Sequence, residues 1–215
     1  MRTTLGQPII IENVAGATGS VGVGRAVRAT PDGYTLIGGT LTTHVLIGAL
    51  YTLPYDLLAD FKPVALLADG PLLMTVVPAM QDLVAGQIDM MIADAATALP
   101  YAGSGRIKPL AVMAKTRMTA APDIPTVDEA GLPEFHASLW YGLWVPARTP
   151  DDIIAKLNAG AVAALADPTV RKRLADLGQD VPPLAEQTPP ALGGRQKAEI
   201  EKWWPIIKAA NIRAE

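Results

Sequence analysis

Short apolar runs separated by turn residues predict alternating strands and helices in the first quarter of the chain. The β-branched run at residues 8–12 is too short for a helix and predicts a buried strand, and residues 21–29 predict a short helix. The turn at 31–33 contains Pro and Gly, which favour a reversal of the chain, and a second strand is expected at 34–37. Residues 40–50 then predict a helix that opens on a threonine cap.

The middle of the chain has the same alternation of short elements. A helix is expected to begin at Met80 and to end at Gly86, a loop or short helix at 94–101, and an irregular Pro- and Gly-rich stretch at 121–134. Further strands are expected at 64–67, 72–77, 88–92, 110–113 and 139–145. Because strands and helices alternate, the pattern predicts an α/β fold with a parallel sheet.

The C-terminal third has the clearest helical periodicity. Thr149 and Pro150 have the residue types of an N-cap and a first helical position. The apolar residues that follow share one helix face, namely Ile153, Ile154, Leu157 and Ala161. A second helix at 169–177 is expected to end at Gly178, and a last amphipathic helix is expected at 199–210.

Composition narrows the class of protein. The chain has 215 residues, of which 50% are hydrophobic and 18% are charged, and its formal net charge is −3. This balance predicts a folded core and argues against a nucleic-acid partner, which would require clustered Lys and Arg. The absence of cysteine excludes disulfides and thiolate metal sites. No run of ~18 apolar residues occurs, so we expect no direct insertion into a membrane.

A glycine-rich turn at 15–24 follows the first predicted strand and opens the first predicted helix. Amides at a helix N-terminus attract anions, so this turn is a candidate site for a carboxylate or a phosphate. Gly16, Gly19, Gly22 and Gly24 lack the spacing of a dinucleotide-binding fingerprint, and no Lys follows them as in a P-loop. The alternative is a tight turn that serves only the packing of helix against strand.

A second junction of glycines and hydroxyls lies at 38–44. Hydroxyl groups and helix-end amides can hold a small oxyanion there without a formal positive charge. The alternative is N-capping of the following helix by Thr40 or Thr42. His44 ends this segment and fits either a ligand-binding residue or a buried structural histidine.

Catalysis has little support in the sequence. His44 and His136 lie far apart and lack the short spacing of a metal-binding pair, so we expect no metal site. Asp89 and Asp94 flank one predicted strand and do not form an acid–base pair. With no catalytic residue identified and no cofactor implied, the pattern favours a binding protein over an enzyme.

Motifs along most of the chain occur in an order that resembles one known family. They are ENVAGATG at 12–19, PDGYTL at 31–36, PYD at 54–56 with DFKP at 60–63, GQID at 86–89, GRIKPLAV at 105–112, PTVDEAG at 125–131 and SLWYG at 138–142. The set resembles the extracytoplasmic substrate-binding proteins of tripartite tricarboxylate transporters, also called the Bug family.

The resemblance implies an α/β fold like that of type II periplasmic binding proteins, with two lobes that close on a small organic carboxylate or related metabolite. The partner that it implies is the membrane permease of the transporter. Residues 1–75 plus 142–215 would form the first lobe, and 76–141 a much reduced second lobe. The ligand-binding residues that it implies are Gly16, Ala17, Gly19, Thr40, Thr42, Thr43 and His44 in the first lobe, Asp94 in the second, and Trp140 and Tyr141 near the hinge.

The chain departs from the family pattern in two places. By comparison with the family pattern, we expect that a signal peptide, a first strand and a first glycine-rich loop are missing before Met1, and that a long segment of the second lobe is missing at Met80–Gln81. We therefore expect impaired binding, and a chain that is periplasmic by family but as written would remain cytoplasmic. Two alternatives stay open: a cytoplasmic nucleotide-binding enzyme built on the Gly16–Gly24 turn, and a non-binding remnant that oligomerises.

Overall fold

The computed structural model describes residues 1–76 and 90–212, and the chain divides into two compact units. Unit 1 comprises Met1–Leu67, Trp140–Asp167 and Pro182–Glu215, and unit 2 comprises Ala68–Leu139 and Pro168–Val181. Residues 168–181 are part of unit 2, and the resemblance implies that they belong to the first of two ligand-binding lobes. The division into two lobes that close on a ligand stays a prediction.

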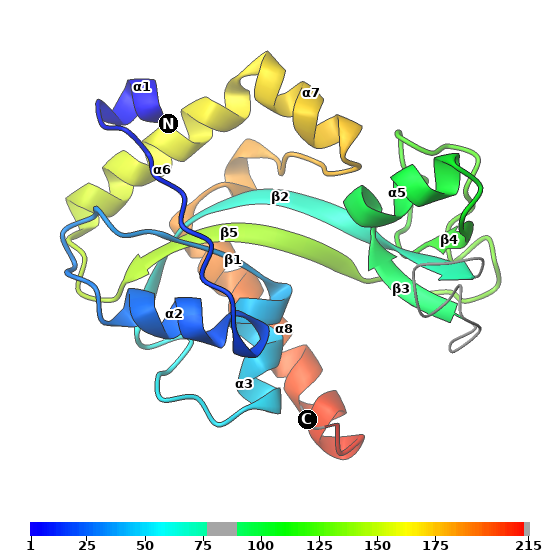
Figure 1. Ribbon diagram of the computed structural model, residues 1–215, viewed down its shortest axis with the longest axis horizontal. Coiled ribbons are helices and arrows are strands. Elements are labelled where there is room, and N and C mark those ends of the chain that lie inside the picture. The colour runs from blue at the N-terminus through cyan, green and yellow to red at the C-terminus, as the bar shows by residue number, and fades with distance from the viewer. Residues whose placement is uncertain (77–89, 213–215) are drawn as a thin grey trace. The chain divides into compact units, whose positions relative to one another are not determined.

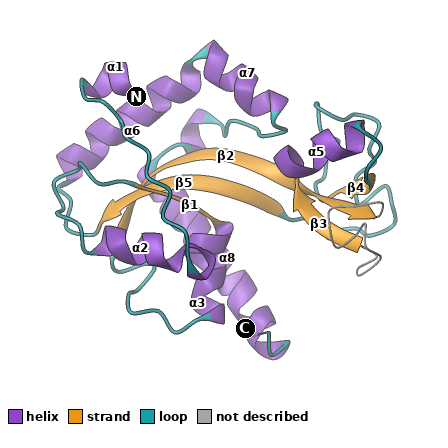
Figure 2. Cartoon of the chain, viewed as in Figure 1, coloured by secondary structure: helices purple, strands orange, loops and turns teal. Residues whose placement is uncertain are grey.

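Unit 1 combines helices with part of a sheet (Figure 2). Its elements are α1 (Arg2–Leu5), the 3-10 turn η1 (Ala17–Gly19), α2 (Ser20–Val27), β1 (Ile37–Thr40), the π-helical turn η2 (Thr42–Leu46), α3 (Ile47–Leu50), α6 (Asp151–Ala166), the 3-10 turn η3 (Leu184–Glu186) and α8 (Pro189–Ala209). Unit 2 contains β3 (Met90–Asp94), α5 (Ala95–Gly103), β4 (Lys108–Val112) and α7 (Pro168–Asp176). Two long strands, β2 (Phe61–Val76) and β5 (Ser138–Pro146), contribute residues to both units.

The mixed α/β class is confirmed, but the expected parallel sheet is wrong. Within the described residues, the strand pairs β1–β5, β2–β3 and β2–β4 are all antiparallel. Figure 1 shows β2 and β5 side by side and pointing in opposite directions. The partner of β1 is β5, about a hundred residues later, rather than the next strand along the chain. The crossover rule behind the parallel prediction therefore does not apply to this pair.

The predicted strand at 8–12 is also wrong. These residues form no strand, and the side chains of Ile10 and Ile11 are 83% and 82% exposed. A strand forms only when a neighbouring strand takes up its backbone groups, and no strand in the described part of the chain does so here.

Two further boundaries differ from prediction because of capping. Helix α6 has Pro150 rather than Thr149 as its N-cap, and the Thr149 side chain is buried. Helix α8 begins at Pro189 rather than at 199, because the hydroxyl of Thr188 accepts a hydrogen bond of 3.3 Å from the Ala191 amide. The predicted strands 64–67 and 72–77 are parts of the single strand β2 as far as Val76, and residues 77–89, with the helix expected from Met80, lie outside the described residues.

Most other local predictions are confirmed within a few residues. Helices at 21–29 and 169–177 correspond to α2 and α7, and Gly178 follows α7 with a φ of +67°. The short helix after Asp94 is α5, and the stretch 121–134 has no helix or strand.

Each unit has its own apolar core. In unit 1, α6 packs Ile154, Leu157 and Ala161 against Val64 and Val145 of the sheet. In unit 2 one apolar cluster comprises Leu73, Ala93, Ala95, Ala98, Ile107, Val112 and Met118, and a smaller one comprises Ala111, Met113 and Val127. No single helix among residues 1–76 and 90–212 has both the length and the apolar character of a membrane span, and only α6 and α7, joined across a bend, pass that test together.

Candidate functional site

The glycine-rich turn before α2 has a left-handed backbone. Gly16, Ala17, Thr18 and Gly19 all have positive φ, at 129°, 43°, 54° and 89°. Ala17 and Thr18 carry Cβ atoms, for which this conformation costs about 1–2 kcal/mol per residue. Gly19 is the N-cap of α2 and provides no side-chain cap, so the first amides of α2 lack the side-chain acceptor that a Ser or Asp would supply.

The second predicted junction, between β1 and η2, is held by two threonines. The Thr40 amide donates to the Thr43 hydroxyl at 2.9 Å, and the Thr43 amide donates to the Thr40 hydroxyl at 3.4 Å. This reciprocal pair resembles a capping box. The Thr40 hydroxyl thus accepts from the Thr43 amide as an N-cap would, although the N-cap of η2 itself is Leu41.

The fold brings these two junctions together in unit 1. A Cβ atom on Gly19 would lie 2.8 Å from Cγ2 of Thr43, so the turn can approach the threonines only because residue 19 is glycine. On the other side of Thr40, Tyr141 is its directly opposite partner on β5. The cluster formed by Gly16–Gly19, Thr40, Thr43 and Tyr141 is called the glycine–threonine site below.

Two tyrosines that sequence reasoning missed hold the glycine-rich turn. The hydroxyl of Tyr51 lies 2.9 Å from the hydroxyl of Thr18, and the hydroxyl of Tyr55 donates to the Ser20 carbonyl at 3.1 Å. Partial burial raises the pKa of Tyr55. Gly24 makes room for this ring, since a Cβ there would lie 3.1 Å from it. Neither tyrosine had a local signal, because each acts on a turn more than 30 residues earlier in the chain.

His44 lies behind the glycine–threonine site and is fully buried. Its imidazole stacks on the indole of Trp144, and its Nδ1 lies 3.0 Å from the Thr43 hydroxyl. Burial lowers the pKa of His44 to about 3, so the ring is neutral at pH 7. In this structure the side chain of His44 supports Thr43 from the protein interior.

Trp140 and Tyr141 are neighbours on β5, and their side chains point to opposite faces of the sheet. Trp140 is fully buried, with its ring 6.0 Å from that of Trp144. The guanidinium of Arg195 lies 5.6 Å from the centroid of the Trp140 ring. A contact of Trp140 with ligand stays a prediction.

Asp94 belongs to unit 2, where it is the N-cap of α5. One carboxylate oxygen accepts from the Thr97 amide at 2.9 Å, and the other accepts from the Thr97 hydroxyl at 2.8 Å. The structure thus assigns this side chain a capping role, and its predicted contact with ligand stays a prediction.

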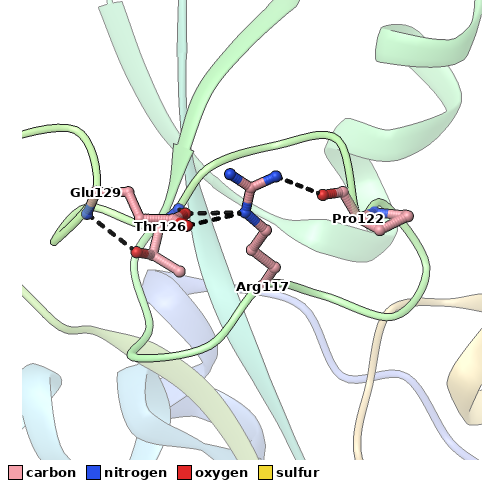
Figure 3. A network of polar contacts seen from close by, with 4 residues as sticks. All are labelled: Arg117, Pro122, Thr126 and Glu129. Carbon is pink, nitrogen blue, oxygen red and sulfur yellow. Dashed lines mark hydrogen bonds and ion pairs between the residues drawn. The ribbon is translucent and has the colours of Figure 1, made fainter.

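A second group of polar contacts lies in unit 2 (Figure 3). Arg117 pairs with Glu129 at 2.9 Å and donates to the Pro122 carbonyl at 2.9 Å. Glu129 also accepts from the Thr126 amide at 2.8 Å and donates its own amide to the Thr126 hydroxyl. The hydrogen bond from Arg117 lowers the pKa of Glu129. These groups bond one another within a single loop, so we interpret the network as a lock on loop conformation.

The second histidine of the sequence, His136, is hydrogen-bonded to a carboxylate. His136 lies 3.0 Å from the carboxylate of Asp128 in unit 2, and this hydrogen bond lowers the pKa of Asp128. Among the residues that the structure describes, no three His, Cys, Asp or Glu side chains come together as potential metal ligands.

Comparison with known proteins places these features in a family. The family model described as the tripartite tricarboxylate transporter family receptor matches residues 1–79 and 77–212. A relative from Agrobacterium vitis, a UPF0065 protein in the TAR-I ttuE-ttuC' intergenic region, is 31% identical over 276 positions, which cover 98% of this chain and 78% of the relative. Protein BugT of Bordetella pertussis is 26% identical, with 99% of this chain and 82% of BugT covered.

Solved structures agree with the sequence comparison. MatC from Rhodopseudomonas palustris, solved with bound malate, has a TM-score of 0.87 and 34% identity, and the match covers 96% of this chain and 90% of MatC. The periplasmic binding protein BugD has a TM-score of 0.87 and 26% identity, with 99% of this chain and 90% of BugD covered.

The same comparisons confirm that the chain is shortened internally. The two parts of the family match meet at 77–79, next to the predicted junction at Met80–Gln81. The alignment with the Agrobacterium vitis relative spans 276 positions, more than the 215 residues of this chain, so that relative carries internal segments with no counterpart here.

Proposed function

The chain belongs to the family of tripartite tricarboxylate transporter receptors, and on this premise we propose that it is an extracytoplasmic solute-binding protein for a small organic carboxylate. The observation that carries the proposal is the contact between Gly19 and Thr43. It brings the amides at the start of α2 next to the hydroxyls at the end of β1 and the start of η2, which supports one continuous polar surface.

Carboxylate binding at this surface needs no lysine or arginine. The backbone amides that follow Gly16 and Ala17 lie near the positive end of the α2 dipole, whereas the amide of Ser20, which follows Gly19, donates to the Ala17 carbonyl. The hydroxyls of Thr40 and Thr43 donate to a carboxylate oxygen, and Thr42, the first residue of η2, adds a third hydroxyl. Hydrogen bonds to a charged group are worth about 1.5–3 kcal/mol each, so two or three of them suffice for a reversible receptor.

The other predicted residues support the site in different ways. We assign His44 to the placement of Thr43, and Trp140 to the packing behind β5, because both are fully buried. Tyr141, opposite Thr40, contributes its ring to the surface. Asp94 is proposed as the contribution of unit 2.

The class of ligand and the partner follow from the relatives. MatC, the structure with bound malate, is 34% identical to this chain over most of its length, which favours a small dicarboxylate. A receptor of this family delivers its ligand to a membrane permease, and BugD is a periplasmic protein. We therefore propose a periplasmic location, a permease partner, and binding without catalysis.

Calorimetric titration with malate tests the proposal. Wild-type protein is expected to bind malate, with an affinity reduced by the missing segments. Thr43→Val, which removes one hydroxyl at almost constant volume, is expected to bind about 10- to 100-fold more weakly than the wild type. Thr52→Val is the matched control, because Thr52 is exposed and outside the site. Absence of binding by the wild type to malate and to a panel of other small carboxylates, or equal affinities of the two variants, would contradict it.

A further inference from the structure

The turn that carries Thr43 is wound as a π-helix. Its signature is the hydrogen bond from the Ile47 amide to the Thr42 carbonyl, five residues earlier. π-Helical turns are less stable than α-helical ones and occur often at functional sites. Something outside the turn must therefore stabilise it.

Two side chains of α8 donate hydrogen bonds to carbonyls of this turn. Nε2 of Gln196 donates to the His44 carbonyl at 2.9 Å, and Nε1 of Trp204 donates to the Val45 carbonyl at 2.9 Å. The two donors are eight residues apart on α8, a little over two helical turns. Side-chain donors that bond successive backbone carbonyls favour a widened turn, because those carbonyls then accept hydrogen bonds from outside the helix.

Gln196 holds the side chain of His44 as well as its backbone. Its Oε1 accepts from the Trp144 indole at 3.1 Å, and the imidazole of His44 stacks on that indole. Its Nε2 also donates to the Leu57 carbonyl at 3.0 Å. The buried carboxamide of Gln196 thus uses its oxygen acceptor and both of its N–H donors. It fixes the indole of Trp144, and the imidazole stacked on that indole places its Nδ1 next to the Thr43 hydroxyl.

We propose that Gln196 and Trp204 of α8 are positioning residues of the glycine–threonine site, which hold the π-helical turn so that Thr43 faces Gly19. The proposal rests on the proposed function, since it assigns these residues a role in carboxylate affinity. Neither residue needs to touch the ligand, because each acts through the turn.

Adjacent tryptophans on α8 provide a matched pair of variants. Trp204→Phe removes the hydrogen bond to Val45 and keeps an aromatic ring. Trp203→Phe removes a bond of 2.6 Å to Glu199, which lies within α8 itself. A second pair compares Gln196→Met with Gln187→Met, since Gln187 is also buried in unit 1 but its side chain bonds the Pro182 carbonyl.

The experiment combines malate titration, thermal unfolding and amide hydrogen exchange of residues 42–47 in all four variants. Trp204→Phe is expected to weaken malate binding about ten-fold and to speed exchange in the turn, while Trp203→Phe stays within about two-fold of the wild type. Gln196→Met is expected to do the same relative to Gln187→Met. If Gln196→Met does not fold, the tryptophan pair decides.

The outcomes separate the two proposals. If the wild type binds malate and each variant has the affinity of its control, the positioning role is overturned while the proposed function stands. If the wild type binds no carboxylate, the proposed function fails, and hydrogen exchange of residues 42–47 alone then decides whether α8 stabilises the turn. Equal exchange rates of these amides in Trp204→Phe and Trp203→Phe would show that Trp204 does not stabilise it.

Discussion

The imidazole of His44 lies nearly flat against the indole of Trp144, with ring centroids 3.8 Å apart and ring planes at 15°. The space for this stack comes from two glycines that face each other across β1 and β5, Gly39 and Gly142. A Cβ on Gly39 would collide with the imidazole, and a Cβ on Gly142 would lie 2.7 Å from the indole. A buried aromatic stack thus supports the threonine whose hydroxyl we place in the carboxylate site.

Substitution of Gly39 tests the packing of this stack. Gly39→Ala is expected to destabilise the protein by about 1–3 kcal/mol, the usual cost of overpacking a core. Gly38→Ala is the matched control, because Gly38 is exposed on the same strand and a Cβ there meets no atom within 4 Å. Urea unfolding measures both variants. Equal free energies of unfolding for the two would contradict the account of the stack.

Acid should destabilise the folded state through His44. Because burial lowers its pKa to about 3, from 6.5 for the free side chain, the unfolded chain binds a proton between these values and the folded protein does not. The contribution of neutral His44 to the free energy of unfolding is fully present above pH 6.5, and it decreases as the pH falls toward 3. The expected loss between pH 7.5 and 5.5 is about 1.4 kcal/mol.

The variant His44→Gln isolates this contribution from that of the carboxylates. Its free energy of unfolding should fall less than that of the wild type over the same pH range, whatever its stability at pH 7.5. His136→Gln serves as the comparison, because its imidazole is paired with Asp128 rather than buried in the core. A wild-type pH dependence that is unchanged in His44→Gln would refute the buried neutral histidine.

Substitution of Gly19 tests the contact between the two halves of the site. Gly19→Ala places a methyl group 2.8 Å from Thr43 and forces an L-residue to a φ of +89°. We expect loss of stability and at least ten-fold weaker carboxylate binding. Gly6→Ala is the matched control. Gly6 also has a positive φ, +69°, but a Cβ there meets no atom within 4 Å, so this variant should be less stable than the wild type and bind carboxylate equally well. Equal affinities in the two variants would separate Gly19 from the site.

Local features of the fold could be predicted from the sequence, and features that depend on distant partners could not. Helix α2 and the end of α7 at Gly178 are encoded in neighbouring residues. The prediction of a strand at 8–12 was wrong. An apolar, β-branched run favours a strand, but the strand also needs a neighbouring strand to pair with its backbone groups. The antiparallel pairing of β1 with β5 joins segments about a hundred residues apart, which a local pattern does not encode.

The site divides in the same way. The glycines and threonines of the proposed site could be suggested from the sequence because each group is contiguous there, and the structure brings Gly19 close to Thr43. Tyr51 and Gln196 were not identifiable, because each acts on the site only after the chain has folded back across long separations. The positive φ of Ala17 had no signal either, since alanine rarely adopts that conformation.

The most direct test of the carboxylate site is a malate titration of uniformly ¹⁵N-labelled protein followed by amide chemical shifts. The account predicts saturable shifts centred on the amides of residues 16–22 and 40–44, with smaller effects elsewhere in unit 1. Shifts that centre on other segments, or an absence of shifts from malate and other small carboxylates at millimolar concentration, would contradict the central claim that the glycine–threonine site binds a carboxylate.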